Sequence, residues 1–155
     1  MTVIAHVSDF HLIPVPFPFG EGLKPALGWI NWRRKPGAHD NDAGARTIAA
    51  VRACAPDHVA LTGDLIELGL PAEYAAAGAL LARLGEPDRV SWAPGNHDVY
   101  TPRAGERLQA VLADWFGPSA GADLRHRFPR LDLVGRAAVV TLCSGTPTWL
   151  FSAEG

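Results

Sequence analysis

The stretch "HVSDFHL", residues 6–12, follows the apolar run Val3-Ile4-Ala5 almost at the start of the chain. The apolar lead predicts a short buried strand over residues 2–8. Asp9 and His11 come directly after it, separated by one residue. If the backbone is still extended there, both side chains lie on the same face of it. The stretch therefore predicts a carboxylate and an imidazole side by side at the carboxyl end of a strand.

Two later apolar runs end in polar turns of the same kind. A strand predicted over residues 57–62 ends in Gly63-Asp64, and a strand over residues 89–93 leads into Gly95-Asn96-His97-Asp98. The two glycines would let the backbone turn sharply or approach another segment closely. Ligand sites in open α/β sheets form outside the carboxyl ends of the strands. If the three strands are neighbours, we expect these polar side chains to converge on one edge of the sheet.

Helical patterns alternate with these strands. Apolar spacing predicts helices over residues 42–55 and 71–84, and Thr101-Pro102 is typical of the cap and first position of a third helix. Two more strands are expected over residues 131–134 and 137–142. Strands that alternate with helices indicate βαβ units and a layered α/β fold.

The polar residues expected at this edge form a mixed oxygen and nitrogen ligand set. Carboxylate, imidazole and amide groups suit Mn, Fe, Zn or Co better than metals that prefer thiolates. A central carboxylate can bridge two metal ions about 3.5–4 Å apart, and such a pair can activate water for phosphoryl transfer. Each short motif alone is typical of an ordinary turn. All three motifs in this order, each after an apolar strand, favour a metal site.

The motifs Asp9-Phe10-His11, Gly63-Asp64 and Gly95-Asn96-His97-Asp98 together resemble those of the calcineurin-like metallophosphoesterases. The resemblance covers about residues 1–100. Within the family, "VALTGDLIELGLPAEY" and "APGNHDVY" are most similar to the bacterial phosphodiesterase-like branch. The resemblance implies an α-β-β-α sandwich of two sheets between helical layers.

The resemblance also assigns roles to the motif residues. It implies that Asp9 and His11 hold a first metal ion, that Asp64 bridges two ions, and that Asn96 holds the second. The implied cofactors are two divalent or trivalent ions of Mn, Fe, Zn or Co. The implied reaction is hydrolysis of a small-molecule phosphoester, with a phosphodiester as the expected substrate, by in-line attack of a hydroxide bound to this dinuclear centre.

His97 and Asp98 are the catalytic residues that the resemblance implies. His97 would lie beside the phosphate as proton donor or charge stabiliser, and Asp98 would orient His97 through the other ring nitrogen. The family's later histidine motifs, including a Gly-His-x-His pair, have no match here, and His126 is not expected to be a ligand. We therefore expect residues 1–155 to be the N-terminal portion of one domain, mainly its first sheet with its helices, with weak or no activity alone.

Residues 12–38 are rich in proline, glycine and aromatic residues, which predicts a long lid loop with one helical turn near residues 27–32. Three interpretations stay open for this segment. Arg33 and Arg34 could receive a substrate phosphate, the aromatic residues could contact a lipid surface, or the tryptophans could pack on the domain. His39, just beyond, is expected at the entry to the next helix, with Asp40 or Asn41 as its cap.

Composition limits the other classes of function. With 48% apolar and 19% charged residues and a net charge of −2, the 155-residue chain is expected to be globular and soluble. Basic residues are scattered apart from Arg33-Arg34-Lys35, so no nucleic-acid partner is expected. No signal peptide or membrane-spanning run is evident. Cys54 and Cys143 are expected to be small buried residues in a reducing compartment, which favours the cytoplasm.

Two alternatives to a phosphodiesterase remain at this point. The apolar segment 12–38 would also suit a hydrolase of lipid-linked pyrophosphates. A non-catalytic interpretation is an inactive fragment that binds metal, or a partner through an exposed apolar edge.

Overall fold

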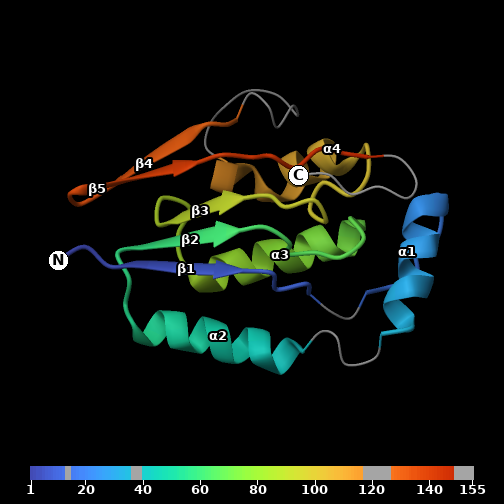
Figure 1. The fold of residues 1–155 in the computed structure, drawn as a ribbon, viewed down its shortest axis with the longest axis horizontal. Coiled ribbons are helices and arrows are strands. Elements are labelled where there is room, and N and C mark those ends of the chain that lie inside the picture. Colours follow the sequence, from blue (N-terminus) through green and yellow to red (C-terminus); the bar gives the residue numbers. More distant parts are fainter. Residues whose placement is uncertain (13–14, 36–39, 117–126, 149–155) are drawn as a thin grey trace.

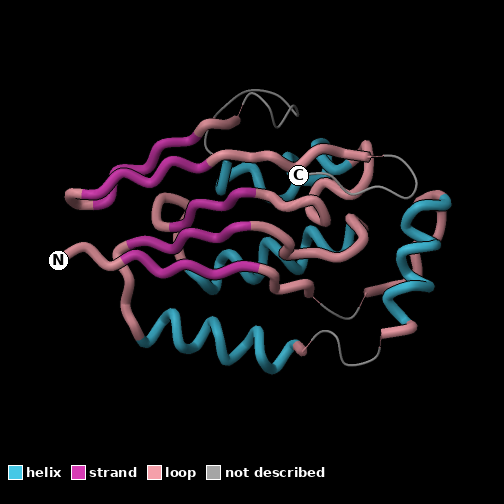
Figure 2. The backbone as a smooth tube through the Cα atoms, in the orientation of Figure 1, coloured by secondary structure: helices cyan, strands magenta, loops and turns pink. Residues whose placement is uncertain are grey.

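The computed structural model describes residues 1–12, 15–35, 40–116 and 127–148. Its centre is a parallel sheet of β1 (Ile4–Ser8), β2 (His58–Thr62) and β3 (Val90–Ala93), in the order β1-β2-β3. The three strands run in one direction, and all of them lead into loops on the same side of the molecule (Figures 1 and 2). The predicted neighbour relation is confirmed, so the three polar turns share one edge of the sheet.

Helices cover one face of this sheet. They are α2 (Asn41–Ala53), α3 (Pro71–Leu84) and α4 (Ala104–Leu112), which continues into the 3-10 helix η1 (Ala113–Phe116). Alternate strand residues and the inner faces of the helices form one hydrophobic core, whose largest fully buried side chains include Trp92, Tyr74 and Leu61. The architecture is the layered α/β fold that the alternation of patterns predicts.

The helix ends follow their local sequence signals with one exception. The side chain of Asp40 accepts a hydrogen bond from the amide of Asp42 at 2.8 Å and caps α2. Pro71 opens α3, where a missing amide hydrogen costs nothing. Helix α4 begins at Ala104 rather than directly after Thr101. The carbonyl of Thr101 accepts a hydrogen bond from the amide of Ala104, so residues 101–104 form a separate turn before the helix.

The two predicted short strands form a hairpin of β4 (Arg130–Val134) and β5 (Ala137–Thr141). This hairpin lies beside β3 (Figure 1). Its inner face is polar at Asp132, which accepts a hydrogen bond from the hydroxyl of Ser91 at 2.9 Å. Its outer face exposes four large apolar side chains: Leu131, Leu133, Val140 and Leu142.

The segment 12–38 contains more regular structure than the sequence indicates. An 11-residue helix, α1 (Leu23–Arg33), occupies its second half instead of one turn. Pro25 lies in the first turn, where the amides have no partner within the helix, so this proline does not break it. Trp29 and Trp32 of α1 are partly buried against the small core of Val15, Leu68 and Leu70. This contact supports the interpretation in which the tryptophans pack on the domain.

The cysteines are less buried than the sequence analysis predicts. Cys54 is exposed at the end of α2 rather than buried, because the last turn of that helix faces solvent, and Cys143 is half-buried. Both cysteines are free thiols. His39 and His126 lie outside the described residues. Among the helices that are described, none has both the length and the apolar character needed to cross a bilayer.

Candidate metal centre

The backbone after β1 turns at once, through two residues in the left-handed region. Asp9 has φ 56° and His11 has φ 42°. The condition of an extended backbone at these two residues is therefore not met, because the strand ends at Ser8. The loop is held instead against the next one: the amide of His11 donates to the carbonyl of Asp64 at 3.0 Å, and the amide of Leu12 donates to Leu65 at 2.9 Å. Asp9 and His11 still reach one site, by a turn rather than by strand geometry.

The loops after β2 and β3 approach each other closely at Gly63 and Gly95. Gly63 has φ 76°, which favours glycine. A Cβ on Gly95 would lie 2.2 Å from Oδ1 of Asp64, closer than any two such atoms can approach. The same Oδ1 accepts the amide hydrogen of His97 at 3.0 Å. The close approach expected of both glycines is confirmed, and it places Asp64 between the other two loops.

Two overlapping groups of metal-ligand atoms result from this arrangement. One group contains Asp9, His11 and Asp64, and the other contains His11, Glu67 and His97, with the atoms of each group within 4.8 Å of one another. Carboxylate oxygens and imidazole nitrogens are fitting ligands for a borderline divalent ion. The structure therefore brings four of the predicted site residues together: Asp9, His11, Asp64 and His97.

Asn96 is placed by its neighbours. It stands between Gly95, which is in close contact with the Asp64 carboxylate, and His97, whose amide donates to that carboxylate. Its backbone therefore lies at the same edge of the sheet as the two donor groups. No contact of its side chain tests the expected role as a ligand.

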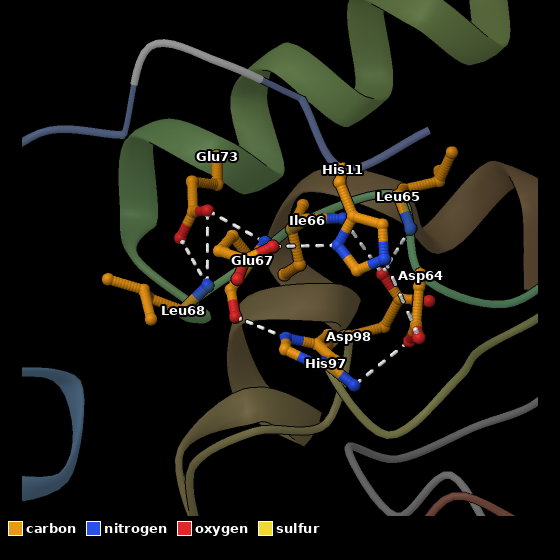
Figure 3. Close-up of polar contacts among 9 residues, drawn as sticks. All are labelled: His11, Asp64, Leu65, Ile66, Glu67, Leu68, Glu73, His97 and Asp98. Carbon is orange, nitrogen blue, oxygen red and sulfur yellow. Dashed lines mark hydrogen bonds and ion pairs between the residues drawn. The ribbon is translucent and has the colours of Figure 1, made fainter. Parts of the chain in front are cut away.

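Glu67 is the site residue that sequence reasoning missed. Its Oε2 lies 2.7 Å from Nδ1 of His11, whose Nε2 is 4.0 Å from Oδ2 of Asp64 (Figure 3). The hydrogen bond to Glu67 raises the pKa of His11 above its ordinary value, against the opposing effect of burial. The available signal was the single charge within the apolar run Leu65-Ile66-Glu67-Leu68, just after the Gly-Asp turn.

The ring of His97 is oriented by a backbone carbonyl. Its Nδ1 lies 2.6 Å from the carbonyl oxygen of Glu67. Since a carbonyl only accepts hydrogen bonds, Nδ1 carries the proton and Nε2 is left for other partners. Tyr100 stacks on the other side, with ring centroids 5.7 Å apart and planes 16° from parallel. These two contacts fix the plane of the imidazole.

The structure gives Asp98 a different task from the one expected. Its carboxylate is fully buried, and its oxygens accept from backbone amides of Leu65 and Ile66 on one loop and of Gly95 on the other. Burial raises the pKa of Asp98 to about 7, although the amide hydrogen bonds oppose this shift. The prediction that Asp98 orients His97 is wrong, because the side chain faces the loop backbones. It joins the loops that carry Asp64 and His97.

Glu73, in the first turn of α3, holds the loop that carries Glu67. Its carboxylate accepts a hydrogen bond from the amide of Glu67 at 2.8 Å, and both of its oxygens accept from Leu68 (Figure 3). It also accepts from the amide of Leu70 at 2.7 Å. Burial raises the pKa of Glu73. Glutamate at the third helical position is the usual partner of the cap amide, and this was the signal that could have identified it.

The fold and the donor groups define an α/β protein with a candidate metal site at the carboxyl edge of its sheet. The model of the calcineurin-like phosphoesterase family matches residues 2–149. The chain therefore belongs to the calcineurin-like phosphoesterase family, a family of metal-dependent hydrolases of phosphoric esters. No curated protein matches the sequence.

Proposed function

We propose that the chain hydrolyses phosphodiesters at a centre of two metal ions. The observation that carries this proposal is the group of Asp9, His11 and Asp64, whose ligand atoms lie within 4.8 Å of one another, with Glu67 and His97 in an overlapping group beside it. Asp64 is the candidate bridging ligand because it lies between the loops: one oxygen is 4.0 Å from His11, and the other accepts from the amide of His97. Asp9 and His11 would hold one ion, and Asn96 would contribute to the second.

Metal ions bound there would supply Lewis-acid stabilisation of the phosphoryl group and an activated water. The chain's own residues would do the rest. Nε2 of His97 is the ring nitrogen left free to hold a proton for a substrate oxygen, since Nδ1 is engaged by Glu67. The Asp98 carboxylate keeps the loops of Asp64 and His97 at a fixed separation. Such positioning of reacting groups lowers the entropic cost of the reaction.

A diester is the preferred substrate class because "VALTGDLIELGLPAEY" and "APGNHDVY" resemble the phosphodiesterase-like branch of the family. The two free thiols, Cys54 and Cys143, support a reducing compartment such as the cytoplasm. The substrate would be a small phosphoester that reaches the strand-end loops from solvent.

The test compares a chromogenic phosphodiester with the matching monoester, using the purified chain with added Mn²⁺. We expect slow turnover by this chain, faster for the diester than for the monoester, with loss of turnover on adding a chelator and recovery when Mn²⁺ is restored. Asp64→Asn should reduce the rate by about 100-fold or more, whereas Asp88→Asn, at an exposed aspartate, should not. Metal-independent turnover would contradict the whole proposal, and preference for the monoester would contradict its diester part.

A further inference from the structure

Helix α1 is apolar on two opposite faces. Pro25, Trp29 and Trp32 face the domain, where the tryptophans pack against the small core that includes Leu68 and Tyr100. The other face is exposed and carries large apolar side chains four and three positions apart, with exposures of 60% for Leu23, 38% for Leu27 and 43% for Ile30. A helix with apolar side chains on both faces is typically covered on both.

The loop before α1 extends this exposed apolar face. Phe17 is 46% exposed and Phe19 is 83% exposed, and their ring centroids lie 4.5 Å apart. Phe17 also contacts the ring of Trp29 at 5.0 Å. The two phenylalanines and the exposed face of α1 are together called the α1 patch: Phe17, Phe19, Leu23, Leu27 and Ile30.

Positive charge is concentrated at one end of the α1 patch. Arg33, Arg34 and Lys35 are all exposed there. Between residues 15 and 35 the chain has four cationic side chains and one carboxylate, although the net charge of the whole chain is −2. The guanidinium of Arg33 lies over the Trp29 ring at 4.9 Å, which places a cation beside the aromatic cluster.

The helix of the α1 patch packs closely against the domain. A Cβ on Gly28 would lie 2.7 Å from Leu68 and 2.8 Å from the hydroxyl of Tyr100, so the helix backbone is in close contact with both residues. The ammonium of Lys24 lies 4.3 Å from the centroid of the same Tyr100 ring. In Figure 1, α1 stands across from the carboxyl ends of the strands. The patch is thus a preformed surface at the same end of the molecule as the metal site.

We propose that the α1 patch binds the surface of a bilayer that contains anionic phospholipids. The apolar side chains would enter the headgroup region, while Arg33, Arg34 and Lys35 would face lipid phosphates. Clustered cations beside aromatic and aliphatic side chains match this partner in both charge and polarity. A second copy of the chain fits less well, because a two-fold contact through the patch would bring like charges together. The inference does not depend on the proposed function.

The outer face of the hairpin offers a matched comparison. It is equally apolar, at Leu131 and Leu133 on β4 and Val140 on β5, but Arg136 is the one exposed cation at its turn. If exposed apolar area alone caused binding to vesicles, both surfaces would contribute. If the combination with clustered cations is required, the α1 patch alone would bind.

The experiment is co-sedimentation of the full chain with vesicles of phosphatidylcholine, either pure or mixed with phosphatidylglycerol. We expect binding to the mixed vesicles that weakens as salt is added. Leu27→Glu with Ile30→Glu should weaken it by about tenfold or more. Arg34→Glu with Lys35→Glu, at exposed positions that require no repacking, should do the same. The hairpin control, Leu131→Glu with Leu133→Glu, should bind like the wild type.

Three results would overturn the proposal. The first is the absence of wild-type binding to phosphatidylglycerol vesicles. The second is equal loss of binding in the hairpin control and in the α1 variants. The third is a dimer in size-exclusion chromatography that Leu27→Glu with Ile30→Glu dissociates, since a second copy would then cover the patch. Hydrolysis is not part of this readout, so a failure here leaves the proposed function to its own test.

Discussion

Oε2 of Glu67 lies 2.7 Å from Nδ1 of His11, which joins the loop after β2 to the loop after β1. The Glu67 side chain is 13% exposed and that of His11 is 18% exposed, so water screens the contact only in part. At the same time the carbonyl of Glu67 orients His97. One residue therefore contacts imidazoles from two different loops, one through its side chain and one through its backbone.

Replacing Glu67 with glutamine should weaken metal binding by about 10- to 100-fold, because it removes a charged donor from one group and the charged partner of His11. The change also lowers the raised pKa of His11, which reduces competition from protons. The affinity is therefore best measured by calorimetry near pH 8, where an ordinary histidine is already neutral. Glu86→Gln, at an exposed glutamate, is the control. Equal affinities in the two variants would exclude Glu67 from the site.

Gly95→Ala should damage both stability and metal binding. The new Cβ would lie 2.2 Å from Oδ1 and 2.8 Å from the backbone nitrogen of Asp64, so the two loops must separate. Overpacking of this kind costs about 1–3 kcal/mol. Thermal unfolding and metal titration measure the two effects. Gly44→Ala is the control, since its Cβ would meet Phe10 at an ordinary 3.4 Å within a helix. A Gly95→Ala protein that behaves like the control would show that the loops tolerate separation.

Glu73→Ala should destabilise the fold by about 3 kcal/mol or more. The carboxylate accepts from the amides of Glu67, Leu68 and Leu70, and a buried donor left without a partner costs about 1–3 kcal/mol. Glu73→Gln should cost less, because the amide keeps one acceptor oxygen. Urea denaturation ranks the three proteins. Equal stability of the alanine and glutamine variants would mean that the loop does not depend on these hydrogen bonds.

His58 should make the fold less stable in mild acid. It is the first residue of β2, it is buried, and it is hydrogen-bonded to Ser91 of β3. Burial lowers its pKa below 6.5, with Arg130 and Arg89 acting in the same direction and Asp132 and Asp88 opposing. The unfolded chain therefore binds more protons below pH 6.5, so this contribution is complete above that pH and is lost as the pH falls.

The test of His58 is the difference in unfolding free energy between the wild type and His58→Gln as a function of pH. This difference removes the contributions of other histidines, including that of His11, whose raised pKa acts in the opposite direction. The variant should gain stability relative to the wild type as the pH falls below 6.5. A constant difference across this range would contradict the prediction.

The strands and the order of the site loops could be predicted because they depend on local signals. Short apolar runs identified β1, β2 and β3, and a polar residue after each run marked the site edge. Gly63 and Gly95 predicted the close approach of the loops, which the structure confirms. Such features need only the strand pattern and the rule that sites lie at the carboxyl ends of parallel strands.

The remaining features depend on tertiary contacts that no short pattern encodes. Asp98 follows His97 in sequence, yet its side chain turns to the backbone amides of another loop. Glu67 reaches His11 across a gap of more than fifty residues. Helix α1 was not predicted because Pro25 and Gly28 interrupt its pattern, and packing of Trp29 and Trp32 stabilises it. In each case the decisive partner lies far away in the chain.

The left-handed backbone at Asp9, His11 and Asp64 has a consequence for how the chain tolerates change. Side chains other than glycine pay about 1–2 kcal/mol for this conformation, so three of the predicted ligand positions oppose folding. Selection for thermal robustness alone would favour glycine there and would erase the chemistry. Asp9→Gly should therefore unfold at a higher temperature than Asp9→Ala, although neither supplies a ligand. At these three positions, folding stability favours glycine, whereas metal binding requires a ligand side chain.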